Sequence, residues 1–297
     1  MHGNSALPNF DARVSPIDGL LSDTPLADFL PWCRMAKRFF GTLFARPQAV
    51  PMPTAADWHE AAGVALFAGF KEDELLRLRA LAEQLLADKT FTPVADAQPT
   101  GADIAAIALH AALPIVKLGV SWYQGWQEVV LYPAQFIHKA EEMDAHGVVH
   151  QMHHVRSGEA WAGGPLILSL DDLKWSGRGE GYDVVIHEFA HKLDMANGKG
   201  SGGVDGLPPP HNDMKVADWA AAFEPAYQNF RHRVDAGEET EIDPYAGESP
   251  AEFFAVLTEY FFDLPEALVE AYPAVYDQMR RFYRQDPMER FYDVTNS

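Results

Sequence analysis

Cysteine is almost absent from the chain. The 297 residues contain a single one, Cys33, so no disulfide can form within the chain and a metal site built from several thiolates is excluded. Proteins without disulfides are typical of reducing compartments. The sequence therefore predicts a cytoplasmic protein in which Cys33 is inert.

Basic residues are also scarce. The chain has 23 Lys+Arg against 43 Asp+Glu, which gives a net charge of −20. Nucleic-acid binding depends on neutralising phosphates with Lys and Arg, so this charge argues against it. The basic run within residues 34–46 interleaves its charges with phenylalanine and leucine, which favours an amphipathic helix covering an apolar surface over a membrane-binding one. We expect no direct nucleic-acid partner.

Long hydrophobic runs are missing. The longest weakly polar stretch, residues 104–116, has 13 residues and includes His110 and Pro114. A membrane-spanning helix needs about 20 apolar residues. The first residues also lack the charged-then-apolar pattern of a signal peptide. We therefore expect no membrane association.

The remaining composition is that of a globular protein, with 47% apolar and 22% charged residues. Periodicity and breaker residues predict helices, then short β-rich runs, then helices again, which is an α+β fold. The predicted helices cover residues 55–70, 72–88, 102–120 with a break near Pro114, 181–196, 216–235, 250–262 and 265–284, and the β-rich runs cover 128–137 and 165–170.

The domain organisation follows from the same reading. Residues 1–50 are expected to form a flexible tail and, at 26–46, the amphipathic helix. Residues 51–125 are predicted to be a helical part, and residues 126–297 the catalytic core with a small mixed sheet.

Residues 182–194 read YDVVIHEFAHKLD, in which His187, Glu188 and His191 form an H-E-x-x-H motif. On a helix the two histidines lie one turn apart on one side, and the apolar residues of the segment lie on the opposite side. Two imidazoles so placed can reach one Zn²⁺, and Glu188 beside them can take a proton from water. A pair of surface histidines is the weaker interpretation, because an apolar face lies behind the motif.

A catalytic zinc site needs a third protein ligand. The pattern H-E-x-x-H-x-x-G-x-x-H is absent, because its glycine and last histidine would fall on Asp194 and Asn197. Asp194 lies on the ligand side of the helix and could bind the metal or orient a ligating histidine.

The segment 245–262, YAGESPAEFFAVLTEYFF, offers further carboxylates. Ser249 is a predicted N-cap, which puts Glu252 at the third helical position. There Glu252 is either the third ligand or one half of a capping box. The residues alone leave four candidates, Glu252 first and then Asp194, Glu248 and Glu259.

The HEFAHKLD segment, together with Y-x-x-x-x-S-P-A-E-F-F-A-V-L-x-E-Y-F-F, resembles the Mlc titration factor A family of zinc metallopeptidases. The resemblance runs from about residue 58 to residue 292 and includes GWQEVVLYPAQFI, WAGGPLILS and FYRQDP. It implies a zincin-like, gluzincin-type fold similar to the catalytic domain of anthrax lethal factor. Residues 1–50 have no counterpart in it.

The resemblance also implies roles for individual residues. By position, the zinc ligands of the family match His187, His191 and Glu252, its general base matches Glu188, and its oxyanion-stabilising tyrosine matches Tyr245. It implies an aminopeptidase-like activity on peptides or proteins, with Zn²⁺ as cofactor. Since the founding member binds the glucose-responsive repressor Mlc, it also implies the alternative of a factor that sequesters a similar transcriptional repressor, with peptidase activity secondary.

Two weaker signals complete the reading. The run 165–170 is expected to pair with an extended substrate, because strand addition is a common mode of peptide binding. His150, His153 and His154 form a cluster that is either a second metal site or an exposed polar loop. No acidic or thiol partner with ligand spacing accompanies them, which favours the loop.

Overall fold

The computed structural model describes residues 49–134, 136–143, 149–156, 158–160, 163–198 and 204–290. All of them belong to one compact unit, residues 47–297. The tail and amphipathic helix predicted within residues 1–46 lie outside the described residues, and the domain boundary near residue 50 stays a prediction.

Side-chain N-caps fix where two of the first helices begin. Thr54 caps α2 (Ala55–Ala61) and Thr100 caps α4 (Gly101–Ala112), each with an aspartate completing a capping box. Between them lie η1 (Ala65–Phe67) and α3 (Glu72–Asp88). The single helix predicted over 55–70 is wrong, because a turn separates α2 from η1. The helix predicted over 102–120 is too long, since α4 ends two residues before Pro114, which has no backbone N–H to continue the helical hydrogen bonds.

A four-stranded mixed sheet has the order β1-β2-β6-β5. Strands β1 (Thr90–Pro93), β2 (Glu128–Tyr132) and β6 (Leu166–Ser169) are parallel, and β5 (Gly158–Ala160) runs antiparallel to β6. The small mixed sheet of the prediction is confirmed. Because β6 is paired on both sides, the expectation that it pairs with substrate is wrong; in the described part of the chain, β5 is the outer strand on that side.

Strands β3 (Phe136–Met143) and β4 (Val149–Arg156) form a separate antiparallel pair. The segment with His150, His153 and His154 is therefore a strand, and the prediction of a polar loop is wrong. Its backbone groups find partners in β3, which composition alone does not reveal, and the β-rich run predicted over 128–137 is divided between β2 and β3.

Helices dominate the second half of the chain. After α5 (Leu170–Leu173) come α6 (Val184–Met195), α7 (Val216–Asp235), η3 (Pro244–Gly247) and α8 (Pro250–Asp263). The helix predicted over 265–284 is divided into α9 (Pro265–Ala271) and α10 (Pro273–Tyr283), because Pro273 begins a new helix.

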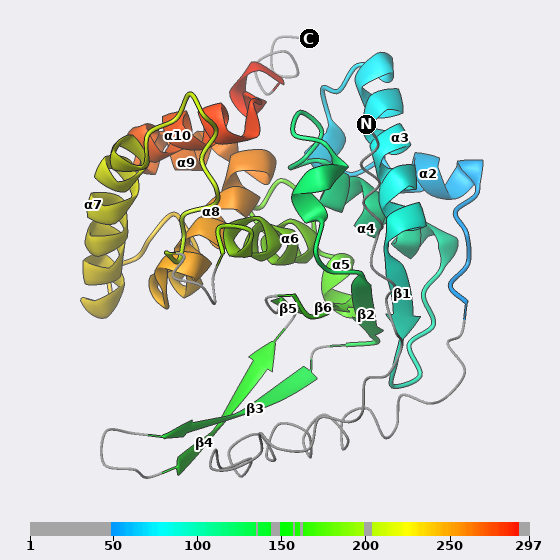
Figure 1. Ribbon diagram of the computed structural model, residues 1–297, viewed down its shortest axis with the longest axis horizontal. Helices are drawn as coiled ribbons and strands as arrows, with labels where there is room; N and C mark the ends of the chain where they lie inside the picture. Colours follow the sequence, from blue (N-terminus) through cyan, green and yellow to red (C-terminus); the bar gives the residue numbers. More distant parts are fainter. Residues whose placement is uncertain are drawn as a thin grey trace, which may run out of the picture. The chain divides into compact units, whose positions relative to one another are not determined.

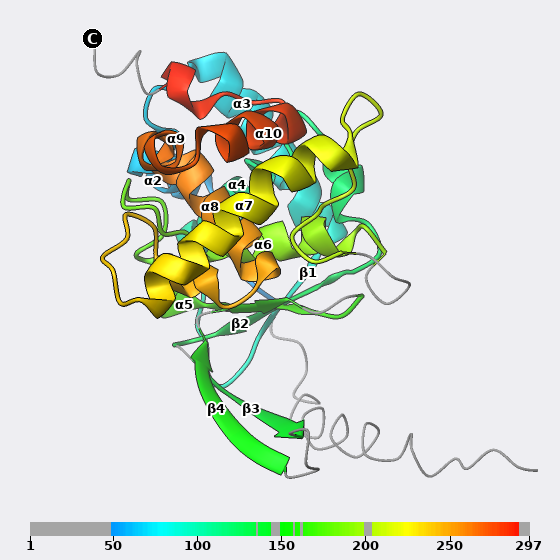
Figure 2. The same ribbon diagram turned by 90° about the vertical axis from the view of Figure 1, so that its left-hand side faces the viewer.

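Helix α6 lies at the centre of this unit, between α8 and the strands β5 and β6 (Figure 1). The view at right angles shows α7, α8 and α10 on the side of α6 away from the sheet (Figure 2). The core between these helices is aromatic, with fully buried Phe253, Phe254, Phe261, Phe282 and Tyr283. The fold is thus α+β and zincin-like, with the H-E-x-x-H helix packed against a small mixed sheet.

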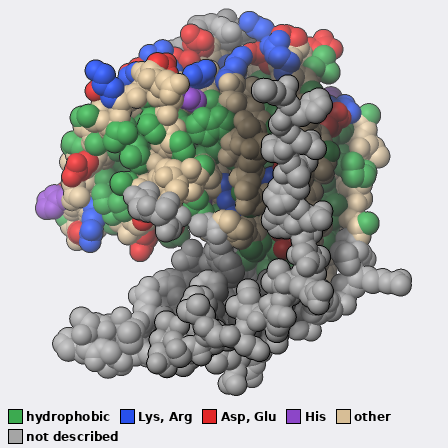
Figure 3. All heavy atoms as spheres, in the orientation of Figure 1, with side chains coloured by type: hydrophobic (Ala, Val, Ile, Leu, Met, Phe, Trp, Pro, Cys, Tyr) green, Lys and Arg blue, Asp and Glu red, His purple; other side chains and the backbone are tan. Residues whose placement is uncertain are grey.

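Two surface findings bear on partners. None of the described helices combines the length and the apolar character needed to cross a bilayer. On the face shown in Figure 3, the Lys and Arg side chains along the upper rim alternate with Asp and Glu side chains. Such mixing does not build the concentrated positive potential that attracts nucleic acid.

Candidate metal centre

The helix that carries the motif is fixed at its start by Asp183. Its Oδ1 accepts hydrogen bonds from the backbone N–H groups of Val185 and Ile186 at 3.0 and 2.9 Å. This is the N-cap arrangement that aspartate favours. The apolar side of α6 is buried as predicted, but the side that carries the histidines is buried as well, because α8 covers it.

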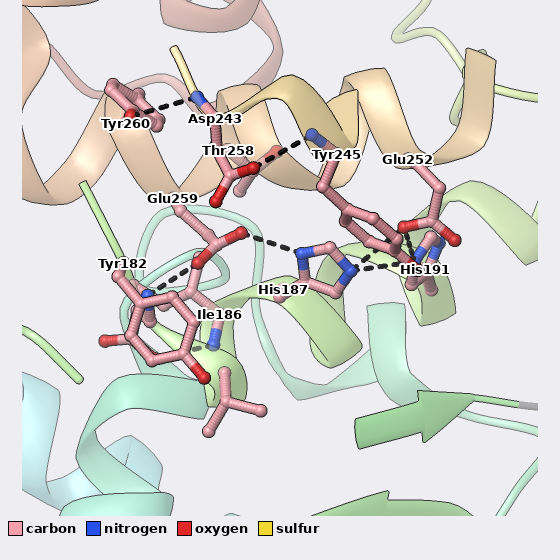
Figure 4. A network of polar contacts seen from close by, with 12 residues as sticks. Tyr182, Ile186, His187, His191, Asp243, Tyr245, Glu252, Thr258, Glu259 and Tyr260 are labelled. Carbon is pink, nitrogen blue, oxygen red and sulfur yellow. Dashed lines mark hydrogen bonds and ion pairs between the residues drawn. The ribbon is translucent and has the colours of Figure 1, made fainter. Parts of the chain in front are cut away.

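The two motif histidines and Glu252 converge on one point. His187 Nε2 lies 3.1 Å from Glu252 Oε2, and His191 Nε2 lies 3.2 Å from both Glu252 Oε2 and His187 Nε2. Figure 4 shows the three side chains pointing toward one another from α6 and α8. Among the described residues, they form the one group of three metal-ligating side chains whose ligand atoms all lie within 4.8 Å of one another.

The start of α8 places Glu252. Ser249 is the N-cap, and its hydroxyl accepts the N–H of Glu252 at 3.1 Å, while Pro250 occupies the first helical position. The sequence left open whether the Glu252 carboxylate turns back to the cap. It lies instead against the imidazole nitrogens of His187 and His191.

The three donors fit a metal ion. Ligands at about 2.0–2.1 Å from a tetrahedral ion are about 3.3 Å apart, close to the 3.1–3.2 Å found here. Two imidazole nitrogens at 3.2 Å, each with its unshared electron pair turned to the same point, would repel one another without a cation between them. The chemistry of the donor set therefore matches a divalent ion held by three protein ligands.

The three rival ligands lie elsewhere. Asp194 is fully buried, and its Oδ2 accepts the backbone N–H of Gly206 at 3.0 Å, which holds the loop after α6. Glu248 is exposed at the end of η3. Glu259 contacts His187 on the side of the ring away from the cluster.

Glu259 binds the other nitrogen of His187. Its Oε1 lies 2.7 Å from Nδ1, and its Oε2 accepts the backbone N–H of Asp183 at 2.6 Å. A carboxylate accepts hydrogen bonds, so the proton sits on Nδ1 and the electron pair of Nε2 faces the cluster. Burial raises the pKa of Glu259 to about 7, against the opposing effects of His187 and of the Asp183 N–H.

Burial and the neighbouring charges shift the pKa values of all three side chains in the cluster. Burial works to lower the pKa of His187, but Glu259 and Glu252 raise it well above its usual value. Burial lowers the pKa of His191. Burial would raise the pKa of Glu252, yet its contacts with the imidazoles of His187 and His191 hold it well below its usual range. Glu252 is thus held as a carboxylate, the form that binds metal.

Glu188 lies on α6 beside His187 and is 4% exposed. Gly158 of β5 packs against it so closely that a β-carbon at position 158 would overlap the carboxylate. One turn further on, Lys192 donates to the backbone carbonyls of Gly164 and Pro165, which holds the start of β6 to α6.

Tyr245 approaches the cluster from η3. Its ring centroid lies 6.0 Å from that of His187, and the side chain is 42% exposed. The ring points toward His187, His191 and Glu252 (Figure 4). Asp243 fixes the backbone there by accepting the N–H of Tyr245 at 2.8 Å.

An H-E-x-x-H helix packed against a small sheet, with a glutamate from a later helix beside its two histidines, is an arrangement found in metallopeptidases. Residues 44–284 match the family described as glucose-regulated metallo-peptidase M90, and the chain belongs to that family. It is 42% identical over 254 residues to Mlc titration factor A of Yersinia pestis (strain Pestoides F) and to that of Yersinia pseudotuberculosis serotype O:3 (strain YPIII). Each match covers 85% of this chain and 92% of the relative.

Several residues around the site were not singled out from the sequence. Asp183 could have been, since an aspartate directly before an apolar helical run is a start signal. No pattern marks Gly158 or Lys192, because their partners lie on other elements or are backbone groups.

Proposed function

We propose that this chain is a zinc-dependent peptidase with His187, His191 and Glu252 as the metal ligands. The observation that supports this most is the convergence of their donor atoms at 3.1–3.2 Å in a chain of a metallopeptidase family. Two imidazoles and one carboxylate, with a position left open, are a frequent ligand set of catalytic zinc. Zn²⁺ in such a site supplies a Lewis acid that polarises the scissile carbonyl and makes water more acidic.

The proposed roles of the protein residues follow from their positions. Glu188 accepts the proton of the attacking water and delivers it to the leaving amine, and Gly158 keeps its carboxylate in place. The hydroxyl of Tyr245, a partly exposed side chain whose ring lies near His187, donates a hydrogen bond to the oxyanion that develops on the carbonyl.

The outer edge of β5 is the proposed place for the peptide backbone. An extended peptide can add to an exposed sheet edge through main-chain hydrogen bonds. Because Gly158 of β5 contacts Glu188, a peptide lying along this strand would pass the catalytic carboxylate.

The proposed specificity is aminopeptidase-like, and the proposed location is the cytoplasm. The net charge of −20 favours substrates with a free, positively charged amino terminus. The single cysteine agrees with a reducing compartment. Cleavage of matched peptides with a free or an acetylated amino terminus separates an aminopeptidase from an endopeptidase.

The deciding experiment compares Glu188→Gln with the wild type. The variant should retain one bound zinc per chain and lose peptide cleavage by about 10²–10⁴-fold, because the proton acceptor is gone. Glu83→Gln, which changes an exposed glutamate paired with Arg79, serves as the control and should cleave normally. A Glu188→Gln protein that cleaves at the wild-type rate contradicts the proposal.

A second candidate function rests on the name of the relatives, Mlc titration factor A. We propose that a transcriptional repressor similar to Mlc is a partner that this chain sequesters, with peptidase activity secondary. Binding of purified Mlc by the wild type and by Glu188→Gln tests it. Equal binding by both proteins supports a binding role independent of cleavage, and no binding by either contradicts it.

A further inference from the structure

A chain of buried polar contacts leads from the first helices of the unit to the metal ligand His187. His110 on α4 lies 2.5 Å from Asp183 through its Nδ1. The backbone N–H of Asp183 donates to Glu259, and Glu259 binds Nδ1 of His187. Figure 4 shows the last part of this chain, from Glu259 to His187.

His110 is held firmly in this position. Its side chain is almost fully buried, with Phe67 packed edge-on at 5.3 Å. On another side, a β-carbon at Gly177 would come within 2.8 Å of the ring. Within the described part of the chain, Nε2 has no hydrogen-bond partner, so the contact with Asp183 is the one polar contact of the ring.

The Asp183 side chain makes two kinds of contact. One carboxylate oxygen caps α6 and the other meets His110, so the side chain cannot rotate without losing a contact at each end. Its backbone N–H is thereby directed at Glu259. Glu259 in turn is buried and spans Asp183 and His187 with its two oxygens.

We propose that His110 and Glu259 are positioning residues for the metal centre, because together with Asp183 they hold the His187 ring in the orientation that turns Nε2 toward the ion. His110 does so indirectly, by holding Asp183, the N-cap of α6, whereas Glu259 contacts the His187 ring directly. This inference rests on the proposed metal centre. Partners that orient a ligating histidine in this way typically change metal affinity 10- to 100-fold when they are removed.

The test measures zinc affinity by competition with a chelator of known affinity, using Zn²⁺ alone. Glu259→Gln should bind zinc about 10- to 100-fold more weakly, since an amide oxygen can serve only one of the two donors. Asn and Leu have nearly the same shape, and Asn places an N–H where His110 Nδ1 stands. His110→Asn should therefore stay within about threefold of the wild type, whereas His110→Leu should bind about tenfold more weakly.

A second variant, His110→Gln, keeps the test decisive if the His110→Leu protein does not fold. The Gln amide does not reach the Nδ1 position, so this variant too leaves Asp183 without the donor that His110 supplies. Visible absorption of the Co²⁺-substituted proteins reports the ligand geometry directly, and it should change in His110→Leu, His110→Gln and Glu259→Gln. Unchanged affinity and spectrum in Glu259→Gln, or equal weakening by Asn and Leu at position 110, would overturn the inference. A wild-type protein that binds no zinc would instead refute the proposed function.

Discussion

Gly158 of β5 lies against the carboxylate of Glu188 on α6, with no space for a side chain between them. Gly158→Ala should therefore displace Glu188 while leaving the three proposed metal ligands in place. We expect the variant to bind zinc with unchanged affinity and to lose at least tenfold in kcat, because small misplacements of a catalytic group are costly.

The matched control for this change is Gly247→Ala. A β-carbon at position 247 would meet Val234 at 3.8 Å, an ordinary contact, although Gly247 also lies close to the site in sequence. This variant should keep its activity. Equal loss of kcat in both variants would show that the contact with Glu188 is not the cause.

Tyr245→Phe tests the oxyanion role. Removing one donor to an oxyanion typically lowers kcat by about 10²–10³-fold, with little change in KM if the hydroxyl acts only in the transition state. Zinc content should not change. Tyr272→Phe removes a hydroxyl that donates to Asn229 on an exposed surface, and it should behave as wild type.

Asp263 on α8 holds the segment 179–181, which precedes α6. Its carboxylate accepts the backbone N–H groups of Gly179, Glu180 and Gly181 at 2.9–3.1 Å. Asp263→Ala leaves these groups without their acceptor, so urea denaturation should show a loss of about 2–4 kcal/mol in unfolding free energy.

The comparison for Asp263 is Asp277→Ala, which breaks an exposed ion pair with Arg280. Such pairs contribute about 0–1 kcal/mol. A loss no larger for Asp263→Ala than for Asp277→Ala would contradict the anchoring role.

Lys192 gives a pH-dependent prediction. Burial lowers its pKa to about 8, and in the unfolded chain it is about 10.4. Between these values the unfolded state binds more protons, so the contribution of Lys192 to stability rises with pH. Relative to Lys192→Met, the unfolding free energy of the wild type should increase by about 2 kcal/mol from pH 7 to pH 9.5. A difference that does not vary with pH would show that the ammonium group titrates normally.

The sequence predicted the parts of the fold that depend on local signals. The H-E-x-x-H helix is readable because its apolar residues recur at helical spacing, and the start of α8 is readable from Ser249 and Pro250. These signals and the family resemblance together pointed to His187, His191 and Glu252, which the structure brings together.

The strands and contacts that the sequence did not predict depend on partners distant in the chain. Strands β1 and β5 have four and three residues, too few for a periodic pattern, and exist because β2 and β6 pair with them. The contact between His110 and Asp183 joins positions 73 residues apart. No sequence pattern near either residue predicts this contact.

The positions of Glu252, Glu259 and Asp263 on α8 have a consequence for the order of folding. His187 and His191 come together as soon as α6 forms, but Glu252 is 61 residues beyond His191. Contacts of such separation form late, since the intervening chain must first be ordered. The same docking of α8 brings Glu259 to His187 and Asp263 to the segment before α6. The onset of tight metal binding during refolding should thus mark the moment at which α8 docks on α6, late on the folding pathway.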